Sequence, residues 1–189
     1  MSLVQCAAAA AGVFPGQSVS TTAGSLPLPV VMVAIGGAES GWNVTARGDY
    51  GVGGPNCGGY TSWGWLQIHG VHSAYLEAQT GSANPCVWAS WLYDPAHCAA
   101  AALAVYQSQG LGAWSTYQDG RWRQYVAQAS GATQASGRSA ASSGQLTLTD
   151  TAGSGVVQAV NWPVVGIALL LSAGVAGIEV AELRRKAVR

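Results

Sequence analysis

Two carboxylates in the first third of the chain have the surroundings that acid catalysis needs. Glu39 closes a run of apolar residues and stands just before Trp42, and Asp49 follows in a Gly-rich stretch. An apolar environment raises the pKa of a carboxyl group, which can then still donate a proton near neutral pH. Cleavage of a glycosidic bond requires such an acid beside the departing oxygen. The sequence therefore predicts Glu39 as a general acid and makes Asp49 the candidate for a second carboxylate.

Only three other acids precede residue 130, and each has a simpler explanation. Asp94 directly precedes a proline and is predicted to cap a helix. Glu77 lies in a polar stretch, where a solvated side chain is expected. Asp119 stands beside a glycine in a turn-like sequence. This shortage of alternatives leaves Glu39 and Asp49 as the informative carboxylates, and it favours Glu39 as the sole catalytic one.

The composition argues against several other classes of protein. Eight basic and eight acidic residues leave no net charge, so there is no positive surplus for binding nucleic acid. The glycines of residues 51–59 are not followed by Lys-Ser/Thr, so they do not form a phosphate-binding loop. His69 and His72 have no carboxylate near them in sequence, and we expect neither a metal site nor a cofactor.

Four cysteines bear on the redox setting: Cys6, Cys57, Cys86 and Cys98. They form no CxxC pair, which argues against a zinc site, and their even number suggests disulfides in an oxidising compartment. Three pairings are open. The short loop between Cys86 and Cys98 favours that pair and leaves Cys6–Cys57, and free buried thiols are the alternative.

Helices are predicted to position the two carboxylates. Residues 26–39 have one apolar face and two prolines in the first turn, and Gly41 ends this helix. A second helix covers residues 97–109, after the Asp94 cap. The remaining predictions are an Ala-rich helix at 3–13, a connector at 16–25, a Gly-rich loop or short hairpin at 44–64, a helical turn or two at 72–78, and a last helical region at 114–129.

Composition divides the chain into five parts. Residues 1–25 are an N-terminal segment and residues 26–129 a mainly α catalytic domain of the α+β kind. Residues 130–155 are rich in Gly, Ser, Ala and Thr and are predicted to be a flexible linker. An uncharged run then predicts a transmembrane helix at 156–180, and residues 181–189 form a basic tail, which places the C-terminus inside.

Four blocks between residues 27 and 125 resemble, in order, soluble-lytic-transglycosylase and goose-type-lysozyme-like domains, especially those of phages. The first block, AIGGAESGWN at residues 34–43, resembles the motif that holds the catalytic Glu. WGWLQI at 63–68 is similar to the second motif, and LYDPAHCAAA at 92–101 to a third block. Residues 110–122 resemble the closing Gly–Trp–Tyr–Gly pattern.

The resemblance implies a fold, a substrate and roles for single residues. It implies a lysozyme-like domain that acts on peptidoglycan glycan strands, with Glu39 as general acid and then base. The side chains or backbone predicted to contact substrate or to support the site are those of Ser40, Trp42, Gly64, Trp65, Gln67 and Tyr106. The chain departs from the pattern at Cys98, where phage members tend to have Asn, and around Tyr106, where the usual Asn-containing motif is absent.

The same resemblance implies a reaction and leaves alternatives open. A lytic transglycosylase needs only Glu39, because a hydroxyl of the substrate attacks and leaves a 1,6-anhydro sugar. A hydrolase would use Asp49 to activate water. The other alternative is a non-catalytic glycan-binding or structural protein.

The two ends of the chain suggest where the protein works. Residues 1–12 do not look like a signal peptide. Together with the predicted membrane helix, this suggests a phage virion protein with its catalytic domain outside the cytoplasm, which would open the cell wall during genome entry. Its partners would be peptidoglycan, lipid and other virion proteins.

Overall fold

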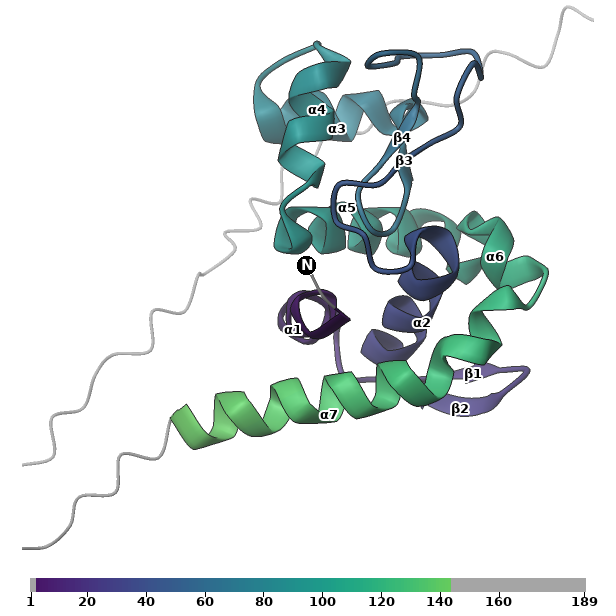
Figure 1. Ribbon diagram of the computed structural model, residues 1–189, viewed down its shortest axis with the longest axis vertical. Coiled ribbons are helices and arrows are strands. Elements are labelled where there is room, and N and C mark those ends of the chain that lie inside the picture. The colour runs from purple at the N-terminus through teal and green to yellow at the C-terminus, as the bar shows by residue number, and fades with distance from the viewer. Residues whose placement is uncertain (1–2, 144–189) are drawn as a thin grey trace, which may run out of the picture. The chain divides into compact units, whose positions relative to one another are not determined.

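The computed structural model describes residues 3–143, and this part of the chain is mainly helical (Figure 1). In Figure 1, α5 crosses the middle of the molecule, α1, α2 and α7 lie on one side of it, and α3 and α4 lie on the other. The helices are α1 (Leu3–Val13), α2 (Leu28–Ser40), α3 (Ser73–Thr80), α4 (Pro85–Leu92), α5 (Pro95–Gln109), α6 (Ser115–Gln118) and α7 (Val126–Ser143), with 3-10 turns η1 (Gly70–His72), η2 (Leu111–Ala113) and η3 (Arg121–Tyr125).

Helix α2 is the core element that carries Glu39. All of its residues from Leu28 to Gly37 are buried, as expected for a helix that is apolar on every side. It begins two residues later than predicted, because residues 26 and 27 belong to a strand. It ends where predicted, since Gly41 adopts a left-handed conformation and its N–H contacts the carbonyl oxygens of Gly36 and Gly37.

Two small antiparallel sheets complete the fold. The predicted connector at 16–25 contains a hairpin of β1 (Ser18–Thr21) and β2 (Gly24–Pro27). The Gly-rich region contributes to a second sheet in the order β3 (Arg47–Gly48), β4 (Ser62–Trp63) and β5 (Ile68–His69). Because its strands have two residues each, this sheet has few backbone hydrogen bonds between its strands.

Helix α5 confirms the predicted cap. Asp94 Oδ1 accepts hydrogen bonds from the backbone N–H groups of Ala96 and His97 at 2.9 and 3.0 Å. These bonds satisfy donors that have no partner within the helix. Gly110 ends the helix, also as predicted.

Two predicted boundaries of the catalytic domain are wrong. Helix α1 packs against α2, α5 and α7 and buries Cys6, Ala7 and Ala10, so the N-terminal segment is part of the domain. The linker predicted at 130–155 is helical as far as Ser143. Buried Ala129 and Ala132 explain this, because small side chains let α7 lie close to α1 and α2.

A disulfide is present, but the favoured pairing, Cys86–Cys98 with Cys6–Cys57, is wrong. Cys57 and Cys86 are bonded, with Cα atoms 4.8 Å apart, and Cys6 and Cys98 are buried free thiols. The physical reason is exposure. Cys86 of α4 is at the surface, where it meets the Gly-rich loop, whereas Cys98 of α5 faces the core.

The transmembrane helix at 156–180 and the basic tail at 181–189 lie outside the described residues. Within residues 3–143, no helix has both the length and the apolar character needed to cross a membrane.

Candidate active site

A cavity of about 360 Å³ contains both predicted carboxylates. Its walls come from the end of α2, the β3–β5 sheet, η1, the C-terminal half of α5, and the segment from η2 to the start of α6. Glu39 and Asp49 both line it, although they come from a helix and from the loop after β3. The fold therefore brings together the two acids that the sequence singled out.

Glu39 lies in the last turn of α2 with its side chain half-buried. Burial raises the pKa of its carboxyl group, and the nearby charge of Asp49 adds a smaller contribution in the same direction. A hydrogen bond from Thr116 and the charge of Arg121 act the other way. Thr116 Oγ1 donates to Glu39 Oε1 at 2.5 Å, and a backbone hydrogen bond from Thr116 also lowers the pKa of Glu39.

The end of α2 is held by its own neighbours. Ser40 Oγ donates to the carbonyl oxygens of Gly36 and Trp65, at 3.2 and 2.9 Å. Ser40 therefore supports the helix end and ties it to the segment after β4. A Cβ at Gly36 would overlap the ring of Trp65, so only glycine permits this close contact. These contacts fix the direction in which Glu39 leaves the helix.

Asp49 is positioned by the sheet. Ser62 Oγ donates a short hydrogen bond to Asp49 Oδ2, and Thr61 Oγ1 donates to the Asp49 carbonyl oxygen at 3.2 Å. Asp49 has a φ of 56°, a left-handed conformation that costs free energy for a residue with a side chain. The hydrogen bonds compensate for this cost and hold the carboxylate at the cavity wall.

Gln67 is the third predicted residue that lines the cavity. It too has a left-handed backbone, with φ 50°, and its Nε2 donates to the carbonyl oxygen of Gly64 at 2.8 Å. Its Oε1 occupies the space where a Cβ at residue 48 would stand, so Gly48 makes room for it. Gly64 itself has φ 79° and packs against Cys98 Sγ. It therefore lies behind the cavity wall and does not line the cavity.

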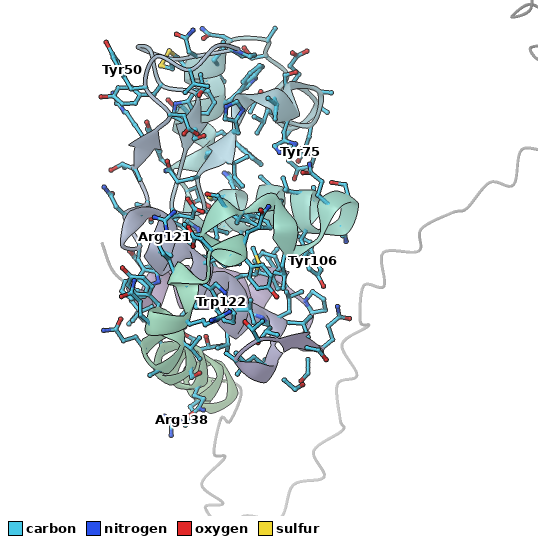
Figure 2. The ribbon with its side chains drawn as sticks, turned by 90° about the vertical axis from the view of Figure 1, so that its right-hand side faces the viewer. Tyr50, Tyr75, Tyr106, Arg121, Trp122 and Arg138 are labelled. Carbon is cyan, nitrogen blue, oxygen red and sulfur yellow. A yellow bond between two sulfur atoms is a disulfide. The ribbon has the colours of Figure 1, made fainter. Side chains whose placement is uncertain are left out.

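Besides Ser40 and Gly64, three other predicted contact residues do not line this cavity. Trp65 is fully buried, with its indole N–H donating to the carbonyl oxygen of Pro95, so it belongs to the core. Trp42 packs inward, because its indole N–H donates to the carbonyl oxygen of Val33 at 2.8 Å. Tyr106 lies on α5 between two residues that do line the cavity. Figure 2 shows it on the opposite side of the molecule from Arg121, whose charge acts on Glu39.

Sequence reasoning missed several residues of the site. Thr116 and Ser62, which hold the two carboxylates, gave no signal because isolated hydroxyl residues are common in loops and caps. His69, at the end of β5, and His72, in η1, also line the cavity. His69 Nδ1 accepts from the Val71 N–H, which leaves Nε2 as a donor in the neutral ring. Burial, and then the charge of His69, lowers the pKa of His72, so this ring is neutral at neutral pH.

The arrangement suits acid–base chemistry on a polar, uncharged ligand. It offers one carboxyl group whose pKa is raised by burial, one fixed carboxylate, and donors from histidine and glutamine side chains. Within residues 3–143, no three metal-ligating side chains gather at one point. No protein-family model, curated protein or solved structure matches this chain.

Proposed function

We propose that this protein cleaves the glycan strands of bacterial peptidoglycan, with Glu39 as the general acid. The observation that carries the proposal is the state of Glu39 at the wall of an open cavity. Burial raises the pKa of its carboxyl group, and the hydroxyl of Thr116 holds this group in place. The choice of substrate rests on the resemblance of residues 27–125 to lytic transglycosylases and goose-type lysozymes.

In this mechanism Glu39 gives its proton to the oxygen of the departing sugar as the glycosidic bond breaks. The sugar that remains carries positive charge in the transition state, which nearby carboxylates stabilise. In the single-carboxylate route Glu39, now ionised, accepts the proton of the substrate hydroxyl that attacks the sugar; in hydrolysis Asp49 would accept the proton of the attacking water. The histidine and glutamine side chains in the cavity would hydrogen-bond hydroxyl and N-acetyl groups of the strand.

Two routes differ in what attacks the sugar. In transglycosylation a hydroxyl of the substrate attacks, and Glu39 is the only carboxylate required. In hydrolysis a second carboxylate activates water on the opposite face of the ring. Asp49 supports the hydrolytic route, because it lines the same cavity and Ser62 holds it in place.

A zymogram of full-length wild type and Glu39→Gln tests the central assignment. General acid catalysis contributes about 10²–10⁴-fold, so we expect E39Q to lose at least about a hundredfold of the clearing activity. Glu77→Gln is the matched control, since Glu77 is an exposed carboxylate outside the cavity. Equal clearing by wild type and E39Q would refute the role of Glu39. No clearing by either would favour a non-catalytic glycan-binding protein.

Mass spectrometry of the released muropeptides distinguishes the two routes. Transglycosylation gives anhydro ends that are lighter by one water than the reducing ends from hydrolysis. Asp49→Asn should abolish hydrolysis but leave transglycosylation largely intact.

Where the protein works stays a proposal from the sequence. We propose that it is anchored in a membrane through residues 156–180 and carried in a phage particle. Absence of the protein from purified virions would contradict the second part.

A further inference from the structure

Arg47 is fixed in place without an acidic partner. Its Nε donates to the hydroxyl of Tyr93 at 3.0 Å, and its guanidinium carbon lies 5.9 Å from the centre of the Tyr60 ring. Tyr60 contacts Tyr50 edge-on at 5.1 Å, and the side chain of Tyr50 is 73% exposed. We call these four residues, Arg47, Tyr50, Tyr60 and Tyr93, the Arg47 patch.

Arg47 is one of the described arginines that form no ion pair. Within residues 3–143, no carboxylate forms an ion pair with it, whereas Arg121 is bound to Asp119 at 2.7 Å. An exposed arginine normally keeps its conformational freedom, and losing it costs free energy. Here two aromatic side chains hold the guanidinium, although the Arg47 side chain is exposed. Such a pre-oriented fork fits a carboxylate.

The register of the sheet places the patch next to the cavity. Gly48 pairs with Ser62, which lines the cavity, and Arg47 pairs with Trp63, so the side chain of Arg47 leaves the opposite face. Strand β3 is an edge strand, and Asp49 at the cavity wall is two residues from Arg47. Two residues of strand cover about 7 Å along the backbone. A branch of a ligand that leaves the cavity over this edge therefore needs to cross only about that distance from Asp49 to reach the Arg47 patch.

We propose that the Arg47 patch binds a carboxylate of the peptide stem that branches from the peptidoglycan strand. This inference rests on the proposed function. Stem peptides carry free carboxylates, and a stem of about four residues reaches about 14 Å when extended, which is enough to pass the edge of the sheet. The exposed ring of Tyr50 would cover the apolar part of the stem. The disulfide between Cys57 and Cys86 ties the loop that bears Tyr60 to α4, next to Tyr93.

The first test compares cleavage of two substrates by the full chain. One is intact peptidoglycan, and the other is the same glycan after an amidase has removed the stems. A charge-assisted hydrogen bond is worth roughly tenfold or more in affinity. Arg47→Gln should therefore lower the ratio of the intact to the stripped rate about tenfold. Arg138→Gln is the control, since it removes an exposed arginine on α7 at the far end from Tyr50 (Figure 2).

A ratio that does not change in R47Q would overturn the inference, whether both rates fall or neither does. If the wild type cleaves neither substrate, the proposed function fails, and a binding measurement then tests the patch by itself. The probe is a free stem peptide, titrated by calorimetry into full-length Glu39→Gln. Binding should weaken about tenfold when Arg47→Gln is added, or when the carboxylates of the peptide are amidated. Equal binding by the amidated peptide would show that no carboxylate is recognised.

Discussion

Thr116 Oγ1 and Glu39 Oε1 are joined by a hydrogen bond of 2.5 Å that connects α6 to the end of α2 across 77 positions of sequence. Thr116 is buried, with 2% of its surface exposed. Its hydroxyl stabilises the ionised form of Glu39, while burial of the carboxyl group stabilises the protonated form. Burial and the hydroxyl of Thr116 therefore act on the pKa of Glu39 in opposite directions.

Removal of that hydroxyl should shift the pH profile of the reaction. In Thr116→Val the lowering contribution is lost, so the pKa of Glu39 rises further. Because a general acid must be protonated, the alkaline limb of kcat/KM should move to higher pH. The maximal rate should fall by up to about tenfold, the equivalent of about 1.4 kcal/mol, because Oε1 is no longer fixed. Thr116→Ser keeps the hydroxyl, so its alkaline limb and its maximal rate should be close to those of the wild type. An equal shift of the alkaline limb in the two variants would contradict a role of the hydroxyl.

Glu39 should also lower the stability of the protein at neutral pH. Its pKa is raised in the folded state, so its contribution to stability is full below the unfolded pKa and is lost as the pH rises through the folded pKa. Glu39→Gln, which carries no charge, should therefore have the higher Tm at neutral pH. The difference should vanish in acid. Thermal unfolding of both proteins between pH 3 and 8 would measure it, and a Tm difference that is independent of pH would exclude this cause.

Two glycine substitutions should have opposite effects on unfolding. A Cβ at Gly36 would overlap the buried Trp65 ring, so Gly36→Ala should lower the free energy of unfolding by about 1–3 kcal/mol. Gly131 lies on α7 with open space around it, and Gly131→Ala should raise that free energy by up to about 1 kcal/mol. Urea denaturation gives both values. A neutral G36A would show that Trp65 can move.

The four cysteines should differ sharply in reactivity. Burial raises the pKa of the Cys6 and Cys98 thiols to about 12, so neither should react with iodoacetamide in the folded protein. Both should react in denaturant, whereas Cys57 and Cys86 need a reductant first. Loss of the disulfide, which spans 29 residues, should cost about 3–4 kcal/mol. Peptide mapping would reveal any other pairing.

The sequence predicts elements whose signals are local. The Pro-initiated, Gly-terminated pattern of α2, the Asp94 cap of α5 and the glycine after it are all found in the structure. Each depends on contacts within a few residues of the chain. The assignment of Glu39 and Asp49 to one cavity could also be anticipated, because the chain has so few acids.

Features that depend on packing between distant elements could not be predicted. Whether a tryptophan covers the core or lines a cleft depends on its neighbours in space, and Trp65 is buried in the core. The partner of Cys86 is decided by where α4 meets the Gly-rich loop, and α4 itself was not anticipated. The composition of α7 resembles that of a linker, yet its alanines pack against two helices.

The backbone elements that carry Glu39 and Asp49 differ in local stability. Glu39 belongs to a helix that is buried from Leu28 to Gly37, whereas Asp49 follows a strand of two residues at the edge of a small sheet. Amide hydrogen exchange should therefore be slow in α2 and fast around residues 47–52, since an edge with few ladder bonds opens without global unfolding. On heating, any activity that depends on Asp49 would disappear before the molecule melts.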